Sequence, residues 1–432
     1  LHFRAVQGKQ TVAQEDRLVE FFPGPPAEVL TAANGGRPVG LVETGEFEPP
    51  VSRLVPVPIE RLESVAQVRR FGGRLILVRT VRTFHPRSGL THALLARANT
   101  GDTIVCLGGH PSPLPGDGGS AWLESVRLRR VRPLAPEHAI FANLQTGDLA
   151  NWGLDGDVAH AMLAVPRSGN YRLLADVPGE EPAPVLVELW HGRDGRGRIL
   201  LCGMKLVEKL DMDPVAATLM ANVLRWGQRE KRACTVQAAW IGTDGESEAL
   251  EALRALGVRF VAGTPAVNHV LMTDDVRAAL REHPGLLSGR RTVVVFGADE
   301  SGIQVLNSAL KRRWERSLRA PVPRLGLSVR GGEVREQWTG HPLTAGVRPE
   351  DMRQLVRSAA HSGASPLAAE VDAQHFTALD GRGYIAKYER DGLRLVCWQA
   401  PPSESGAAGR VLAALLTNLG VTMDTVEEGE RR

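Results

Sequence analysis

Apolar runs separated by segments with helical spacing recur along this chain and predict an α/β fold. The second half shows the pattern most clearly, because residues 292–296 form an unbroken β-branched run that is typical of a strand covered on both faces. Earlier in this half, Leu250, Leu253 and Leu256 lie at helical spacing, and Gly257 is typical of the residue that ends a helix. Strands and helices in alternation predict a parallel, doubly wound sheet.

The two halves resemble each other. Residues 137–152 align with residues 340–355 without a gap, so that His138 matches His341 and Asp148 matches Asp351. Four further blocks keep the same order: 39–46 with 239–246, 101–109 with 289–298, 193–202 with 390–397, and 219–224 with 415–420. Five ordered blocks predict a duplicated domain with altered loops. Each copy should end in a hairpin, turning at Asp194-Gly195 or Asp391-Gly392, and a final helix.

Residues 197–227 contain a candidate catalytic or metal site, because Glu208, Asp211 and Asp213 follow an apolar run. Asp213 directly precedes Pro214, and these residue types favour the N-cap and the first position of a helix. The other two acids would add negative charge near the positive end of that helix. A metal-binding aspartate pair or a glycosidase carboxylate pair is the alternative, but no glycine-rich phosphate loop accompanies it. We therefore interpret Asp213 as a helix cap.

Residues 147–159 and 197–226 resemble the C-terminal part of bacterial glycoside hydrolases of the β-galactosidase type. In those proteins a non-catalytic domain with the class I glutamine amidotransferase-like fold follows the catalytic and β-sandwich domains. Residues 37–46 resemble its first strand and turn, and residues 94–109 its helix–Gly–strand step. The resemblance implies two tandem flavodoxin-like domains without catalytic residues. The chain has no barrel-like segment with catalytic carboxylates, so the hydrolase activity would belong to a parent polypeptide.

These observations predict four segments. Residues 1–36 should be a β remnant and linker, left over from a preceding β domain of a larger polypeptide. Residues 37–228 and 234–422 should be the two amidotransferase-like α/β domains, and residues 423–432 a disordered tail.

Cys106 provides the enzymatic alternative, a degenerate or cryptic hydrolase or amidotransferase. Amidotransferases carry a nucleophilic Cys on a sharp strand-to-helix turn, and the run IVCLGGH at residues 104–110 superficially matches it. However, Val105 stands where that family has Gly, and a Pro/Gly-rich segment follows in place of a helix. Without a helix N-terminus nothing lowers the thiol pKa, so a buried strand cysteine is the favoured interpretation.

Four residues are candidates for ligand or interface contacts. Trp152 and Trp190 could stack on sugar rings if they are exposed, and Asp148 and Glu208 could bind polar groups. A free-standing sugar-binding protein is therefore a further alternative. The histidines do not cluster with metal-ligand spacing, so we expect neither a metal nor a cofactor.

Composition narrows the classes of partner. The net charge is only +3, and the basic run at residues 127–132 alternates with apolar residues like a strand with one wet face. We therefore expect no binding to nucleic acid, and no apolar run is long enough for a membrane helix. The compartment stays open between the cytoplasm and export within a larger protein. The favoured function is a non-catalytic accessory and interaction module that contacts adjacent domains, partner subunits or carbohydrate.

Overall fold

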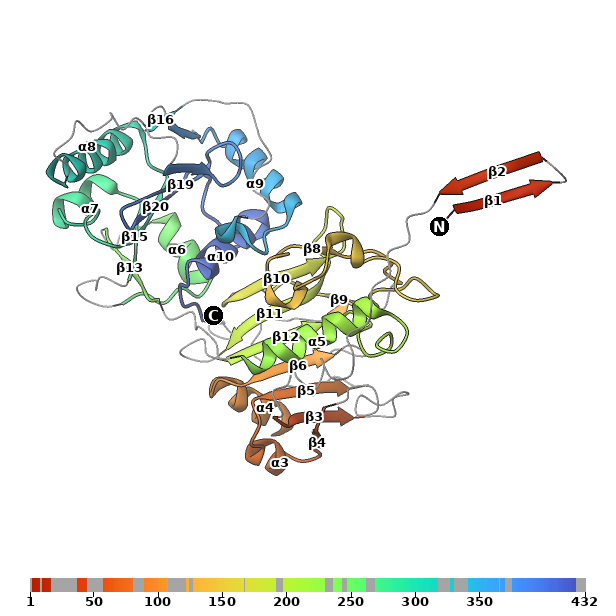
Figure 1. Ribbon diagram of the computed structural model, residues 1–432. Coiled ribbons are helices and arrows are strands. Elements are labelled where there is room, and N and C mark those ends of the chain that lie inside the picture. The colour runs from red at the N-terminus through yellow and green to blue at the C-terminus, as the bar shows by residue number, and fades with distance from the viewer. Residues whose placement is uncertain are drawn as a thin grey trace.

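The structure, a computed structural model, is an α/β fold with two sheets and helices on both faces of each (Figure 1). It describes these residues: 2–7, 10–16, 37–44, 57–80, 89–107, 122–123, 127–166, 168–191, 197–229, 236–242, 247–261, 269–317, 327–329, 341–364, 366–369 and 375–424. The predicted doubly wound fold in two copies is confirmed. The exact domain boundaries stay a prediction. Within the described ranges, no helix is both long and apolar enough to cross a bilayer.

The first sheet has the strand order β4-β3-β5-β6-β12-β11-β10-β8. The first five strands in that order are parallel, and the last three are antiparallel to their neighbours. Its strands are β3 (Val39–Thr44), β4 (Ile59–Arg61), β5 (Leu75–Thr80), β6 (Thr103–Leu107), β8 (Arg132–Pro133), β10 (Tyr171–Asp176), β11 (Pro184–His191) and β12 (Gly197–Cys202). Helices α3 (Val65–Arg70) and α4 (Gly89–Asn99) pack on one face and α5 (Pro214–Gln228) on the other.

The second sheet repeats this plan with the order β13-β14-β15-β20-β19-β18. Its strands are β13 (Ala238–Trp240), β14 (Val270–Thr273), β15 (Thr292–Phe296), β18 (Phe376–Ala378), β19 (Ile385–Arg390) and β20 (Leu393–Trp398). Its helices are α6 (Glu248–Ala255), α7 (Val276–Glu282), α8 (Glu300–Ser317), α9 (Pro349–His361) and α10 (Gly406–Asn418). The predicted turn at Asp391-Gly392 joins β19 to β20, and both residues have positive φ, as a tight hairpin turn requires. The turn predicted at 194–195 lies outside the described residues.

Three two-stranded sheets complete the described strands: β1 (His2–Gln7) with β2 (Gln10–Asp16), β7 (Trp122–Leu123) with β9 (Met162–Leu163), and β16 (Leu327–Val329) with β17 (Leu367–Ala369). The β1–β2 hairpin at the N-terminal end lies apart from both large sheets in Figure 1. Predicted strand residues 127–132 instead form isolated bridges followed by the two-residue β8.

The copies share a polar clamp between a short 3-10 helix and the last α-helix. His138 precedes the 3-10 helix η1 (Ala139–Phe141) and His341 precedes η3 (Pro342–Thr344), and each Nδ1 accepts a backbone N–H two residues on. Asn222 of α5 and Asn418 of α10 each donate to two backbone carbonyl oxygens in and beside that 3-10 helix. The distances are 3.0 and 2.7 Å in the first domain and 3.0 and 2.9 Å in the second. The block that matched these asparagines is therefore aligned as the sequence predicts.

Two other sequence blocks prove to be out of register by one residue. Thr103 and Thr292 are equivalent, and they pair with Arg198 and Arg394 in the next strand, so Arg394 is the partner of Arg198. Cys202 consequently matches Trp398. The sequence alignment, which matched it with Cys397, was wrong by one residue. A shift of one residue turns every side chain to the opposite face of a strand.

The first strands show the same error. Leu41 pairs with Leu77 in the first sheet, and Trp240 pairs with Met272 in the second. Because Leu77 and Met272 occupy equivalent positions, Leu41 matches Trp240, and the block at residues 39–46 is shifted by one. Burial agrees with the corrected register, because these four residues all lie on the sheet face that α5 or α10 covers.

One apolar core runs through both domains. It contains the face of the first sheet that α3 and α4 cover, and it continues through β10 to α9 and α10 of the second domain. Tyr171 and Leu173 of β10 belong to the same buried cluster as Leu355 of α9 and Leu415 of α10. Figure 1 shows α9 and α10 on the side of the second domain nearest β8 and β10. The two domains are therefore packed together by apolar contact as well as by the polar contacts described below.

Candidate functional site

The acidic stretch after β12 serves the backbone and a buried arginine. One carboxylate oxygen of Asp213 accepts the N–H groups of the first turn of α5, at 2.9 and 3.4 Å, and the other accepts the N–H of Gly153 at 2.9 Å. Glu208 receives a hydrogen bond of 2.8 Å from Arg79 of β5, whose side chain is buried. Asp211 is exposed. The part of the chain that the structure describes contains no group of acidic, His and Cys side chains able to hold a metal.

The two candidate tryptophans have different surroundings. Trp152 is 0% exposed, and its Nε1 donates to the backbone oxygen of Asp148 at 2.9 Å, so its ring has no face open to a sugar. The Asp148 carboxylate accepts the N–H of Gln145 at 2.7 Å. Trp190 is half-buried, and the Arg172 guanidinium lies 5.2 Å from its ring centre. Trp190 is therefore close to the junction of the domains, because Arg172 also contacts the second domain.

Cys106 lies within β6, between Val78 of β5 and Leu201 of β12, and is 4% exposed. Its side chain belongs to the apolar core on the α4 face of the sheet. The segment after it, at residues 108–121, lies outside the described residues. In the described part of the chain this thiol is therefore packed within the core.

A cavity of about 480 Å³ opens at the carboxyl ends of the parallel strands in the second sheet. This is the edge at which doubly wound proteins commonly bind ligands. Its three aspartates are all engaged in local contacts. Asp275 caps α7, Asp299 accepts the N–H of Gly302 at 2.6 Å in the first turn of α8, and Asp274 accepts a hydrogen bond from Ser247. Hydrogen bonds from Gly302 and Ser301 lower the pKa of Asp299, which keeps it ionised as a helix cap.

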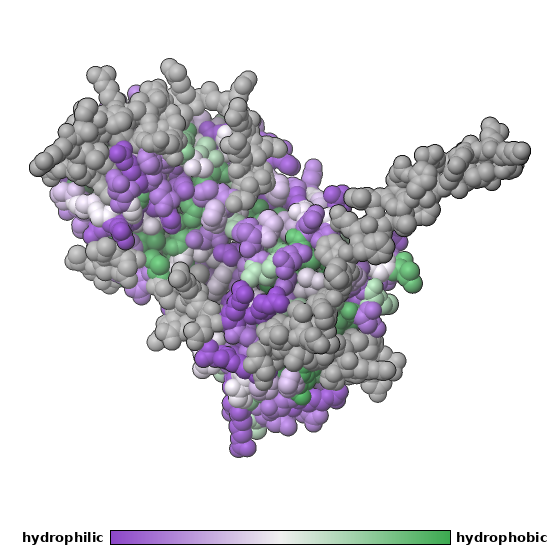
Figure 2. All heavy atoms as spheres, in the orientation of Figure 1, coloured by the Kyte–Doolittle hydropathy of each residue, from purple (hydrophilic) through white to green (hydrophobic). Residues whose placement is uncertain are grey.

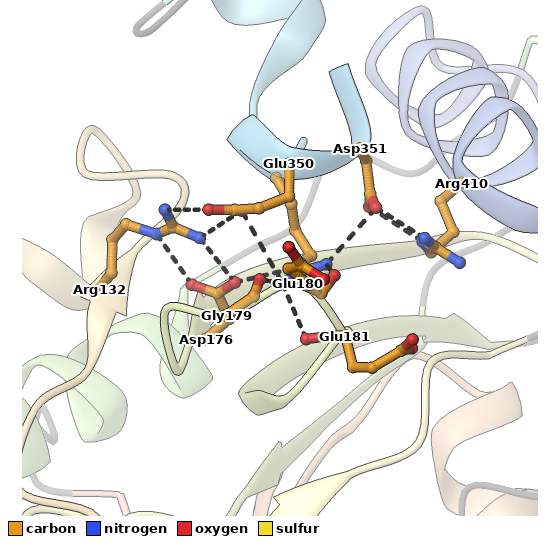
Figure 3. Close-up of polar contacts among 9 residues, drawn as sticks. Arg132, Asp176, Gly179, Glu180, Glu181, Glu350, Asp351 and Arg410 are labelled. Carbon is orange, nitrogen blue, oxygen red and sulfur yellow. Dashed lines mark hydrogen bonds and ion pairs between the residues drawn. The ribbon is translucent and has the colours of Figure 1, made fainter. Parts of the chain in front are cut away.

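The most elaborate polar cluster joins the two domains (Figure 3). Arg348, the residue before α9, is 0% exposed, and its Nε donates to Asp176 at the end of β10 at 2.8 Å. Its Nη2 donates to two carbonyl oxygens of the β10–β11 turn, those of Gly179 at 2.8 Å and Glu181 at 2.9 Å. A buried guanidinium needs such a complete set of acceptors, because an unpaired buried charge is costly.

Two further ion pairs surround this contact. Arg132 of β8 bridges Asp176 and Glu350, with shortest distances of 2.9 and 2.8 Å, and thereby links the first domain to α9 a second time. Burial alone would raise the pKa of Glu350, but the hydrogen bond from Arg132, a backbone hydrogen bond and the charges of Arg132 and Arg348 together outweigh burial and lower it. On the other side, Arg410 of α10 donates to Asp351 at 2.6 and 2.9 Å. The cluster therefore balances three arginines with three carboxylates.

Further hydrogen bonds extend the junction to the end of α10 and the residues after it. Asn170 is buried, and its Nδ2 donates to the carbonyl oxygen of Val421 at 2.8 Å while its Oδ1 accepts the N–H of Met423 at 2.8 Å. Arg172 donates to the Oδ1 of Asn418 at 2.7 Å. Gly346 has positive φ, and a Cβ there would stand 2.9 Å from the carbonyl oxygen of Leu173 in β10. The domains thus approach each other to backbone contact.

This cluster was not predicted from the sequence. In the sequence alignment Asp351 matched Asp148. The alternation of residues 127–132 predicted only that Arg132 lies on the solvent-exposed face of a strand. Asp176 and Arg348 were not singled out, because they are 172 residues apart and neither belongs to a recognised motif. The only available signal was Arg348 itself, an arginine next to Pro349 at the start of an amphipathic segment.

Comparisons with known proteins do not assign a family to this chain. No protein-family model and no curated protein matches the chain. Similar solved structures include a putative ThuA-like protein from Bacteroides uniformis, with 12% identity over 45% of this chain and 93% of that chain and a TM-score of 0.33. They also include the β-galactosidase from Bacillus circulans, with 14% identity over 45% of this chain and 32% of that chain and a TM-score of 0.28. A cytoplasmic protein from Salmonella typhimurium matches at 14% identity, over 53% of this chain and 96% of that one, with a TM-score of 0.29.

Proposed function

We propose that this chain is a non-catalytic accessory and interaction module of a carbohydrate-active polypeptide of the glycoside hydrolase type. Its two amidotransferase-like domains act as one unit, which packs against adjacent domains or partner subunits. The sequence resemblance to domains that follow β-galactosidase-type catalytic domains supports the association with carbohydrate chemistry.

The junction of the domains is the single observation that carries this proposal. The cluster of three arginines and three carboxylates lies where the two domains pack, and Arg348 is enclosed there with acceptors from the first domain. The residues that first looked chemical have structural partners, since Asp213 caps α5 and Glu208 pairs with Arg79. Such an arrangement stabilises a two-domain scaffold and leaves substrate chemistry to another part of the polypeptide.

Turnover of a chromogenic β-galactoside tests the non-catalytic assignment. We expect no hydrolysis by this chain above the rate without protein, and no change on Glu208→Gln or Cys106→Ser. Hydrolysis that disappears with Glu208→Gln would reject the proposal, and hydrolysis or amidotransferase activity that disappears with Cys106→Ser would promote the enzymatic alternative. Circular dichroism of each variant checks that a lost activity does not reflect a lost fold.

An exposed apolar pair suggests where a neighbouring domain or subunit makes contact. Leu154 and Met212 are exposed large apolar residues, and the hydrogen bond from Gly153 to Asp213 brings their two loops together. The Asp155–Lys209 ion pair adds a second link between these loops. On the face seen in Figure 2, the described surface is mainly hydrophilic with scattered hydrophobic patches, so an exposed pair of this kind is conspicuous.

Sedimentation velocity with the complete parent polypeptide tests this contact. Leu154→Glu with Met212→Glu should weaken the contact and expand or dissociate the particle. Glu63→Lys, an exposed change at the start of α3, serves as a surface control and should have no effect. Unchanged sedimentation of the double variant would remove the pair from the proposed interface without affecting the non-catalytic assignment.

A further inference from the structure

A second cavity, of about 230 Å³, lies at the opposite edge of the second sheet, where β14, β15 and β20 begin. Its walls include His269, Arg290, Arg291 and Arg394, together with a single acidic side chain, Glu389. The volume is several times the ~30 Å³ that one water molecule occupies in the liquid, so a small ligand can enter. It is distinct from the acid-lined cavity at the carboxyl edge and from the junction of the domains.

The positive charges are held in place by the strands. Arg291 and Arg394 lie side by side, because the N–H of Arg394 donates to the carbonyl oxygen of Arg291 at 2.8 Å. Arg290 packs its side chain over Gly392 in the hairpin turn, where a Cβ would stand 2.5 Å from its Cγ. The sheet register and the turn therefore fix three guanidinium stems around one small space.

Among the described residues, these positive charges are not neutralised within the cavity. Glu389 accepts hydrogen bonds from Arg394 at 2.9 Å and from Lys387 at 3.2 Å, so this one carboxylate is shared between two cations. The Nε of Arg394 is buried without a hydrogen-bond partner among the described residues. With Arg290 and Arg291 added, positive charge exceeds negative charge among the described residues that line this cavity.

In the first domain, the place equivalent to this cavity, called the corner below, is filled by side chains. The N–H of Arg198 donates to the carbonyl oxygen of Asp102 just as that of Arg394 donates to Arg291, so an aspartate occupies the position of Arg291. The Arg198 guanidinium lies 4.1 Å from the ring centre of Trp226 and donates to the backbone of the same residue.

The end of the last helix explains why only the second domain has this space. Helix α5 continues for six residues beyond Asn222, to Gln228, and so carries Trp226 over the corner. Helix α10 ends at Asn418, the equivalent of Asn222, and Thr422 takes the place of Trp226. The helix and indole that fill the corner in the first domain are therefore absent from the described part of the second.

We propose that this cavity, lined by Arg290, Arg291 and Arg394, binds a tetrahedral oxyanion, a phosphate or sulfate group. Guanidinium groups recognise such anions with paired hydrogen bonds, and several of them around one small cavity suit a dianion. Replacement of Asp102 by Arg291 and loss of the stacked tryptophan together convert a closed structural corner into a binding site.

Thermal unfolding and calorimetry with inorganic sulfate and phosphate test the proposal. At a fixed ionic strength set with chloride, either anion should raise the Tm of the chain by about 2–4 °C. Arg291→Gln should abolish this shift and raise the Kd for sulfate by about tenfold or more. Arg290→Gln, a change at an exposed residue, should weaken sulfate binding in the same direction, which keeps the test valid if Arg291→Gln does not fold.

A matched control separates binding from a general effect of salt. Arg357→Gln removes the same charge from an exposed site on α9 and should keep both the Tm shift and the Kd. Sulfate stabilises many proteins by exclusion from their surface, and that effect would be equal in all variants. Equal shifts in all three variants, or no shift beyond that of chloride, would overturn the proposal. Glucose 6-sulfate and glucose 6-phosphate, titrated in parallel, distinguish a sulfated from a phosphorylated source by the tighter Kd.

Discussion

The two domains keep the same clamp and diverge immediately after it. In both, a histidine caps a 3-10 helix and an asparagine from the last α-helix secures it. The first domain continues with the 3-10 helix η2 (Thr146–Asp148) and a loop, whereas the second forms the thirteen-residue helix α9. Arg348 stands where the first domain has the exposed Gln145. The shared contacts therefore stabilise each domain by itself, and the segment that differs supplies the charges that join them.

Replacement of Arg348 should have the largest effect on this comparison. Arg348→Ala removes a buried guanidinium, which leaves two turn carbonyls without this donor and leaves buried Asp176 paired with Arg132 alone, so we expect a loss of about 3–5 kcal/mol in the free energy of unfolding. Gln145→Ala, at the matching exposed position, should cost no more than about 1 kcal/mol. Urea unfolding of both variants measures the difference, and similar losses would contradict the assigned role of Arg348.

Gly346 tests how closely the domains approach. Gly346→Ala adds a methyl group against the backbone of Leu173 at a residue with positive φ, and should cost about 2–4 kcal/mol. Gly363 also has positive φ, but nothing lies near its Cβ position, so Gly363→Ala should cost only ~1–2 kcal/mol. The difference between the two variants isolates the contact from the backbone strain. Equal costs would show that the contact relaxes.

The clamp itself predicts matched effects. Asn222→Ala and Asn418→Ala each leave two backbone carbonyl oxygens without a donor, and each should cost about 1–3 kcal/mol. Only Asn418→Ala should also change the coupling between the domains, because Asn418 accepts a hydrogen bond from Arg172. A double-mutant cycle with Arg172→Ala should therefore show coupling for Asn418 and none for Asn222.

The smallest effect concerns the loop that replaces α9 in the first domain. The hydrogen bond from Lys209 lowers the pKa of Asp155 to about 2. A carboxyl group with a lowered pKa stabilises the fold above its unfolded pKa near 4, and that stability is lost as the pH falls towards 2. Asp155→Asn should therefore be slightly less stable than the parent chain at pH 7 and equal to it near pH 2. The exposed Ser358 of α9, which has no carboxyl group, should give no such pH dependence when changed to Ala.

Much of the fold could be predicted from the sequence, because periodicity reports burial directly. The β-branched run at residues 292–296 became β15, and the asparagines of the last helices aligned correctly. Register was harder, because shifting an unbroken apolar strand by one residue leaves its apolar character unchanged. Cys202 and Cys397 therefore matched as letters, although they lie on opposite sheet faces.

The junction of the domains could not be predicted for a different reason. Asp176 and Arg348 each look like ordinary surface charges until the fold buries both. Capping, by contrast, is local, so Asp213 followed by Pro214 could be interpreted from five neighbouring letters. Contacts within one turn of a helix can be predicted from neighbouring residues, whereas contacts between distant elements depend on how the whole chain packs.

Helix α10 is enclosed on nearly every side, because one flank covers its own sheet and another meets β10. A force applied to either domain would consequently be transmitted through α10 to the other domain. Cleavage ahead of α10 would uncover β10 at the same time as it opened the second sheet, and the damage would spread across the whole molecule.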